Sequence, residues 1–189
     1  MSAAAQFQLY TAEEYLEEEA SREVRHEYLG GTIHAMAGAS RRHIRLVRRI
    51  DSLLNGRLRG RDCEAWSTEL KLHIKTSLSE YFYYPDVMVG CDPTDDHDYY
   101  LERPSILFEV LSPSTEQIDR REKLLAYQTI PTLRHYVVVA QDERRVEWLH
   151  WEDNAWSLTV LTGPEDRIDF PEQGVSLTLS EIYDGIEFG

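Results

Sequence analysis

Two carboxylates stand inside segments that otherwise have the composition of short buried strands. Asp86 lies in the segment Tyr84–Gly90 and Glu109 lies in Ile106–Thr115, and both segments are mostly apolar. Burying a carboxylate is costly unless a cation or strong hydrogen bonds compensate it. A divalent cation shared by two neighbouring strands would explain both residues, and magnesium prefers carboxylate oxygens. We therefore expect Asp86 and Glu109 to bind Mg²⁺, with Mn²⁺ as a substitute.

A lysine downstream completes a set of residues that could hydrolyse a phosphodiester. The segment Asp119–Tyr127 has a helical pattern that could return Lys123 to the same point. A hard cation lowers the pKa of an attacking water, and a nearby lysine can position the nucleophile or stabilise developing negative charge. The backbone carbonyl of Val110 could add a metal ligand. Other metal hydrolases use similar groups, and the alternative is that each charge is tolerated at a strand end.

The bulk composition is that of one acidic globular domain covering residues 1–189. The formal net charge is −14 and 42% of the residues are hydrophobic. An acidic surface argues against indiscriminate binding to nucleic acid. No signal-peptide pattern or apolar run of transmembrane length is present, so we expect a cytoplasmic protein with no membrane partner. Cys63 and Cys91 have neither zinc-site spacing nor the pattern of a disulfide framework, in keeping with a reducing compartment.

The N-terminal part of the chain carries turn and capping signals. Thr11-Ala-Glu-Glu14 is a capping box, which predicts a short acidic helix to about Ala20. Two extended runs on either side of Gly30-Gly31 predict a β-hairpin. Together they form the expected N-terminal helix and hairpin.

Residues 40–58 are expected to form a helix with a basic face. Ser40 is a plausible N-cap, and the apolar positions recur at helical spacing, namely Ile44, Val47, Ile50, Leu54 and Leu58. The candidate nucleic-acid-binding residues on the other face are Arg41, Arg42, Arg45, Arg48 and Arg49. Phosphate contact is one interpretation of this face. A solvated face that balances the acidic first helix is the other.

The remaining sequence predicts a mixed sheet. Leu70, Leu72 and Ile74 alternate with polar residues, as in a half-buried strand. The acidic loop at residues 92–98 lacks the spacing and glycine of a calcium-binding loop. Further predictions are a core side at Leu124 and Leu125, a central strand at Tyr136–Ala140, a hairpin around Asp153-Asn154 and a last helix opened by Ser180.

These motifs resemble those of a known family. Pro85-Asp86, Glu109 within Phe-Glu-Val-Leu-Ser-Pro-Ser-Thr, the helix Asp119–Tyr127 and the run Pro131–Val139 are similar to the Uma-type endonuclease family. That family belongs to the PD-(D/E)XK, restriction-endonuclease-like superfamily. The resemblance implies an α/β fold with a restriction-endonuclease-like core, in which helices flank a mixed central β-sheet. It also implies Asp86 and Glu109 as magnesium ligands.

One position departs from the superfamily pattern. The lysine of the general motif stands two residues after the acid, and Leu111 occupies that position here. The resemblance suggests that Lys123 has taken over its role. Glu27 and His43 also fall where the family tends to carry Glu and His, and we expect them to support catalysis. For His43, a local hydrogen bond on the helix face is the alternative.

Three functions are therefore open at the level of the sequence. The first is a magnesium-dependent endonuclease that hydrolyses DNA phosphodiester bonds. The second is a catalytically inactive module that binds nucleic acid or serves assembly while keeping the nuclease fold. The third is a metal-dependent hydrolase with another substrate. By analogy with the superfamily we expect a homodimer, because the two strands of a duplex need two active sites.

Overall fold

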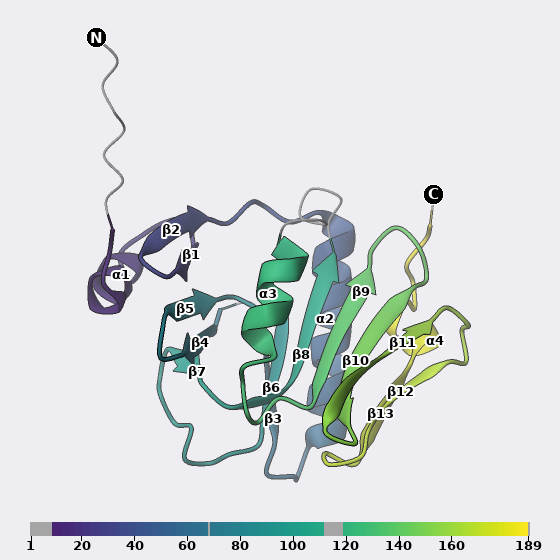
Figure 1. The fold of residues 1–189 in the computed structure, drawn as a ribbon. Helices are drawn as coiled ribbons and strands as arrows, with labels where there is room; N and C mark the ends of the chain where they lie inside the picture. Colours follow the sequence, from purple (N-terminus) through teal and green to yellow (C-terminus); the bar gives the residue numbers. More distant parts are fainter. Residues whose placement is uncertain (1–8, 68, 112–118, 189) are drawn as a thin grey trace.

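The computed structural model describes residues 9–67, 69–111 and 119–188, and its centre is a six-stranded mixed sheet (Figure 1). The strands follow the order β11–β10–β9–β8–β6–β3. Their bounds are β3 Glu64–Ser67, β6 Val87–Gly90, β8 Pro104–Leu111, β9 His135–Ala140, β10 Val146–Glu152 and β11 Ala155–Leu161. β8 and β9 are parallel, and the other neighbours are antiparallel. All six residues of β9 are buried, as expected of a central strand.

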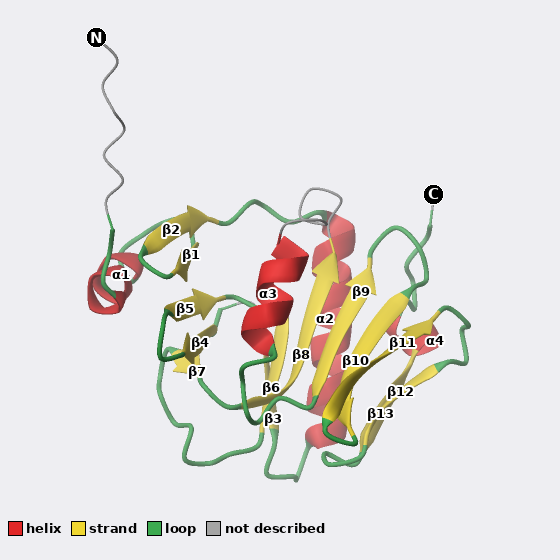
Figure 2. Ribbon diagram, viewed as in Figure 1, coloured by secondary structure: helices red, strands yellow, loops and turns green. Residues whose placement is uncertain are grey.

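Helices cover both faces of this sheet (Figure 2). Along β8, successive side chains alternate between the two faces. Phe108 packs in the cluster that includes helix α2 (Arg41–Leu58), whereas Leu107 packs in the cluster that includes Tyr127 of helix α3 (Asp119–Tyr127). Glu109 has the parity of Leu107, so this alternation places its side chain on the α3 face.

A second sheet of five strands lies beside α3 and holds the expected hairpin. Its order is β2–β1–β5–β4–β7, with bounds β1 His26–Leu29, β2 Thr32–Ala35, β4 Lys71–Lys75, β5 Glu80–Tyr83 and β7 Tyr100–Leu101. The capping box forms at Thr11, and helix α1 runs from Ala12 to Glu19. Leu72 and Tyr83 share a core cluster with Leu107 of the larger sheet, so the two sheets pack together.

The C-terminal part packs on the α2 face. Strands β12 (Arg167–Phe170) and β13 (Val175–Thr178) pair antiparallel, and helix α4 (Leu179–Ile182) follows. The sequence patterns had not indicated β12 or β13. They also placed the helix cap at Ser180, whereas Thr178 is the N-cap and forms a capping box with Glu181.

Some expected core positions were wrong. Ile44 is 42% exposed and Leu125 is 67% exposed. Leu46 replaces Ile44 on the buried side of α2, and among residues 122–127 of α3 it is Tyr127 that is fully buried. His73 is one of the polar residues that alternate with Leu70, Leu72 and Ile74, so the pattern put it on the exposed face. It is buried, and its two ring nitrogens lie 2.7 Å from carboxylate oxygens of Glu80 and Glu102. Contacts with other segments of the chain determine which of these side chains are buried.

The two cysteines form a disulfide, which corrects the expectation that they would not pair. Cys63 is joined to Cys91 across 28 residues of sequence. The antiparallel register of β3 and β6 places Glu64 opposite Gly90, so the next residues outward are these two cysteines. Long-range strand pairing therefore brings together thiols that no local motif connects.

The acidic loop uses its carboxylates for its own turns. Asp92 accepts hydrogen bonds from the backbone and the hydroxyl of Thr94, and Asp95 accepts from the backbone N–H groups of Glu102 and Arg103. Side chains of this kind stabilise turns by replacing backbone acceptors.

Within the described residues, no helix has the length and apolar character needed to cross a membrane.

Candidate active site

Asp86 lies directly before β6 and is held from two sides. Its Oδ2 accepts a hydrogen bond of 2.6 Å from the backbone N–H of Val110 in β8. Its Oδ1 lies 2.9 Å from Nε2 of His43, which comes from the first turn of α2. Both side chains are largely buried, with 14% and 16% of their surface exposed. The long sheet pairing and α2 together fix the direction of this carboxylate.

The pKa of His43 reflects its contact with Asp86. Burial lowers the pKa of His43, but the hydrogen bond and the charge of Asp86, the charge of Glu109 and the Val110 backbone raise it above its ordinary value overall. The contact with Asp86 therefore makes the protonated imidazole more favourable than it is in a free histidine. The sequence left a local hydrogen bond on the helix face as the alternative for His43, and the partner observed is Asp86.

Glu109 is a largely buried carboxylate on the α3 side of β8, with 14% of its side chain exposed. Tyr127 donates a hydrogen bond of 2.8 Å to its Oε1, and the Nζ atom of Lys123 lies 3.6 Å from the same oxygen. Burial raises the pKa of Glu109 to about 7, which Lys123 opposes and Asp86 reinforces. A nearby cation stabilises the charged form of a largely buried carboxylate such as Glu109.

Lys123 joins the two sheets at this point. Its Nζ atom lies 2.9 Å from Oε1 of Glu27, which belongs to β1 of the smaller sheet. The ring of Tyr83 has its centroid 5.7 Å from the same nitrogen, within the range of a cation–π contact. Helix α3 thus brings Lys123 back toward Glu109, as expected from the sequence. Its role in catalysis stays a prediction.

Tyr127 is a site residue to which the sequence patterns assigned no role. It is fully buried, and burial raises its pKa well above the ordinary value, so its hydroxyl keeps its proton and donates to Glu109. Its ring makes edge contacts with Tyr83 and Tyr136. The available signal was its spacing of four residues from Lys123, which places both side chains on one helix face.

The donor set suits a hard cation. Among the described residues, no three side chains of histidine, cysteine, aspartate or glutamate form a group that could hold a metal ion. An ion held by Asp86 and Glu109 would depend on main-chain and water oxygens for the rest of its shell. Magnesium tolerates this arrangement because it usually keeps several waters, so these residues fit Mg²⁺ better than a metal that needs a closed protein cage.

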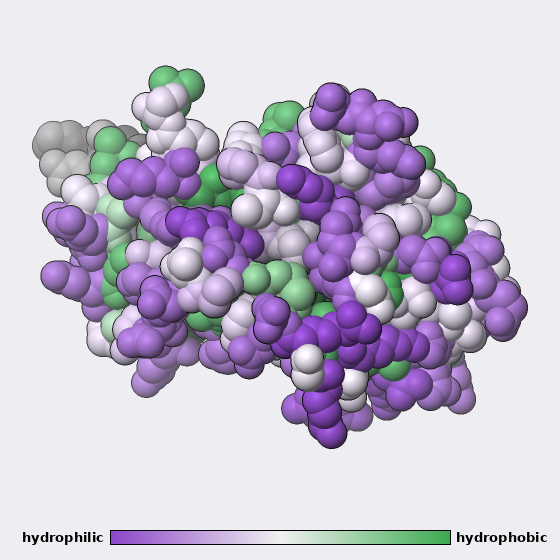
Figure 3. Space-filling view, turned by 90° about the horizontal axis from the view of Figure 1, so that it is seen from below, coloured by the Kyte–Doolittle hydropathy of each residue, from purple (hydrophilic) through white to green (hydrophobic). Residues whose placement is uncertain are grey.

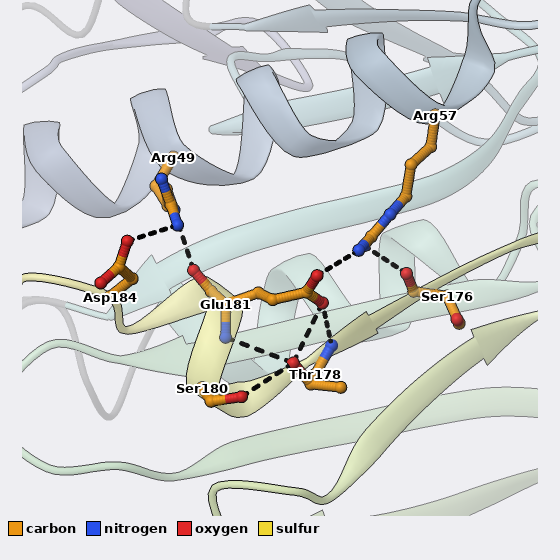
Figure 4. A network of polar contacts seen from close by, with 7 residues as sticks. All are labelled: Arg49, Arg57, Ser176, Thr178, Ser180, Glu181 and Asp184. Atoms are coloured by element: carbon orange, nitrogen blue, oxygen red, sulfur yellow. Dashed lines mark hydrogen bonds and ion pairs between the residues drawn. The ribbon is translucent and has the colours of Figure 1, made fainter.

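The basic face of α2 divides into two parts. Toward its C-terminal half the arginines hold the C-terminal segment (Figure 4). Arg49 donates to the Glu181 carbonyl at 2.9 Å and to Asp184 at 2.6 Å, while Arg57 contacts the Ser176 carbonyl and the Glu181 carboxylate. These arginines therefore stabilise the fold, an interpretation that the sequence did not offer.

The first turns of α2 leave more of the basic face open. Arg41, Arg42 and Arg45 line a cavity of about 420 Å³ together with residues 185–187. Arg42 donates to the Gln141 carbonyl and Arg45 to the Gly185 carbonyl, and Arg41, Arg45 and Arg48 are exposed. Gln141 follows β9 directly, so Arg42 lies at the same sheet edge as the end of β8. Nucleic-acid binding by these arginines stays a prediction.

Comparison with known proteins identifies chains of similar sequence. The sequence model of the Uma2 family, described as "Putative restriction endonuclease", matches residues 12–180. The chain is 34% identical over 188 residues to the uncharacterized protein slr1290 of Synechocystis, which covers 99% of this chain and 98% of that protein. A second uncharacterized Synechocystis protein, sll1609, is 35% identical over 176 residues, covering 90% of this chain and 97% of that protein.

A solved structure has a similar fold. It is the crystal structure of a protein from Anabaena variabilis, described as a putative nuclease belonging to DUF820. The match has a TM-score of 0.73 at 18% identity and covers 92% of this chain and 97% of that one. The likeness confirms the expected fold, an α/β arrangement in which helices flank a mixed central sheet.

Proposed function

This chain belongs to the Uma2 family of putative restriction endonucleases, and on that premise we propose that it is a magnesium-dependent endonuclease that hydrolyses DNA phosphodiester bonds. The observation that carries the proposal is the convergence of Asp86, Glu109 and Lys123 from three separate segments. The Nζ atom of Lys123 lies 3.6 Å from Oε1 of Glu109, and Asp86 accepts a hydrogen bond from the backbone N–H of Val110, the residue after Glu109. The presence of all three residues favours an endonuclease over a catalytically inactive module that keeps the fold.

Each residue has a role that its contacts support. Asp86 and Glu109 would hold the ion, with the Val110 carbonyl as a further ligand. Bound Mg²⁺ supplies polarisation of the phosphodiester and a lowered pKa for the attacking water. Lys123 would orient the nucleophile or stabilise the charge that develops in the transition state.

The surrounding residues would keep the ligands in place. The imidazole of His43 and the N–H of Val110 fix the two oxygens of Asp86. The hydroxyl of Tyr127 orients Glu109, and Glu27 holds the ammonium group of Lys123. Ligands held by such outer contacts bind metal more tightly and with better geometry.

The metal site is tested by thermal unfolding with and without Mg²⁺ or Mn²⁺. An ion that binds the folded state alone should add roughly 1.4 kcal/mol of stability at a free concentration about ten times Kd. We expect this response in the wild type and in Asp98→Asn, a control that removes an exposed charge from the acidic loop. Asp86→Asn and Glu109→Gln should each lose the response. An unchanged response in both variants would place the ion elsewhere.

The open part of the basic face is tested by the salt dependence of DNA binding. Arg41→Gln with Arg45→Gln should weaken binding to all sequences and flatten the slope of log affinity against log salt, since each phosphate contact adds to that slope. Arg59→Gln, at the exposed far end of α2, is the matched control and should leave the slope unchanged. Equal slopes for all three proteins would assign Arg41 and Arg45 to solvent.

A further inference from the structure

Strand β11 is an edge strand that lacks the usual protection of an edge. It pairs with β10 in an unbroken register of seven residues, and no other described strand pairs with it. Its sequence, Ala-Trp-Ser-Leu-Thr-Val-Leu, contains no charged residue, proline or glycine. Proteins normally guard edge strands with charges, prolines, bulges or short length. The opposite edge of the same sheet, β3, has four residues and begins with the exposed Glu64.

Large apolar side chains are exposed along this strand. Leu158 is 57% exposed and Val160 is 44% exposed. They alternate onto the same face as Trp156, which packs partly against the core cluster of α3. Trp151, opposite Trp156 in the hairpin, is 38% exposed. Figure 3, a view from below, shows a mainly hydrophilic face on which hydrophobic residues appear in small separate areas.

The order of residues in β11 is nearly symmetric about its centre. Counting outward from Leu158, the hydroxyl residues Ser157 and Thr159 come first and the bulky apolar residues Trp156 and Val160 come next. We propose that β11 pairs antiparallel with β11 of a second copy of this chain, around a two-fold axis at Leu158. The axis would place Leu158 opposite itself, Ser157 opposite Thr159 and Trp156 opposite Val160.

The residue order of β11 and its lack of charge favour a second copy of this chain as its partner. A two-fold interface must be complementary to itself, and the near-symmetric order of β11 meets this condition on both faces of the strand. Apolar pairs and Ser–Thr pairs directly opposite each other stabilise antiparallel strands. Two copies that each carry a net charge of −14 repel one another, so a strand without charge is a suitable place for contact. Nucleic acid is a poor occupant, because the strand has no basic residue.

The pairing has a consequence for the arrangement of the candidate active sites. A two-fold axis perpendicular to the joined sheet reverses the direction of every strand in the second copy. The C-terminal end of β8, beside Asp86 and Glu109, would then point in opposite directions in the two copies. The two candidate sites would lie at opposite ends of the strands of a twelve-stranded sheet. The two sites would work independently, which differs from the expectation that dimerisation serves cleavage of both strands of one duplex.

Sedimentation analysis of the wild type and two variants tests the pairing. We expect a wild-type dimer at micromolar concentration and a Leu158→Lys monomer, because two lysines would stand directly opposite each other. Leu125→Lys is the matched control, since Leu125 is a similarly exposed leucine on α3, and it should remain a dimer. A monomeric wild type, or a dimeric Leu158→Lys, overturns the proposal. The monomer should cleave DNA at the wild-type rate per chain, so the proposed chemistry is judged separately.

Cross-linking tests the register without depending on that variant. The native cysteines are bonded to each other, so Leu158→Cys introduces the one free thiol. Opposite residues in an antiparallel pair have Cβ atoms roughly 4.5–5.5 Å apart, which is close enough for a disulfide after small adjustment. Leu158→Cys should form a covalent dimer under mild oxidation, whereas Leu125→Cys should not. Equal cross-linking of the two variants would overturn the two-fold register.

Discussion

Lys123→Ala is expected to lower the rate of DNA cleavage by about a hundredfold or more, the scale seen when a transition-state donor is removed. The Nζ atom of Lys123 lies between Glu27 and Glu109 and is the cation that α3 brings to the proposed metal ligands. Leu111 occupies the position at which the general motif has lysine and cannot carry a charge. The measurement is the single-turnover rate at saturating magnesium.

Three comparisons make this result specific to the ammonium group. Stabilisation by magnesium and affinity for DNA should be retained in Lys123→Ala, because the lysine is not a metal ligand. Lys123→Arg should restore little activity, since the guanidinium is broader and differently shaped. Lys75→Ala removes an exposed lysine that is ion-paired with Glu80, and it should cleave at the wild-type rate. Wild-type cleavage by Lys123→Ala would remove this residue from the active site.

Loss of the Cys63–Cys91 disulfide is expected to reduce the free energy of unfolding by about 3–4 kcal/mol, the loop-closure value for a separation of this size. The bond joins residues 28 apart in sequence and ties the entry of β3 to the exit of β6. For a chain of this length the change corresponds to a fall in melting temperature of roughly ten degrees. Denaturation of the wild type with and without a thiol reductant measures it.

The matched protein for this experiment is the double variant Cys63→Ser, Cys91→Ser. It should unfold at the temperature of the reduced wild type, and reductant should have no effect on it. If the wild type is equally stable with and without reductant, and the double variant matches it, the disulfide contributes nothing to stability. In that case the pairing of β3 with β6 alone holds this edge of the sheet.

Elements with local signals form where the sequence predicts them. The capping box at Thr11, the Gly30-Gly31 hairpin, the helix capped by Ser40 and the hairpin turn at Asp153-Asn154 are all present. The turn residues Asp153 and Asn154 have φ angles of 51° and 61°, a conformation that asparagine and aspartate tolerate better than most residues. Such signals act within a few residues, so tertiary contacts rarely override them.

The centre of the site is also indicated by the sequence. An acidic residue in a segment with the composition of an apolar strand is costly to bury, and this cost singles out Asp86, which lies directly before β6, and Glu109 within β8. Lys123 follows from helical spacing, because α3, the next described element after β8, can reach back to the strand end. The approach of Lys123 to Glu109 agrees with this inference, because it depends on one helix and the neighbouring strand. The roles of Asp86, Glu109 and Lys123 in a site stay predictions.

The partners of residues that are far apart in sequence depend on the tertiary structure. The register of β3 and β6 brings Cys63 to Cys91, and the packing of the C-terminal segment on α2 binds Arg49 to Asp184. The contact of His43 with Asp86 and that of Lys123 with Glu27 likewise cross between separate elements. The physical reason is that periodicity tells which face of an element is apolar, whereas strand order and helix packing determine what that face meets.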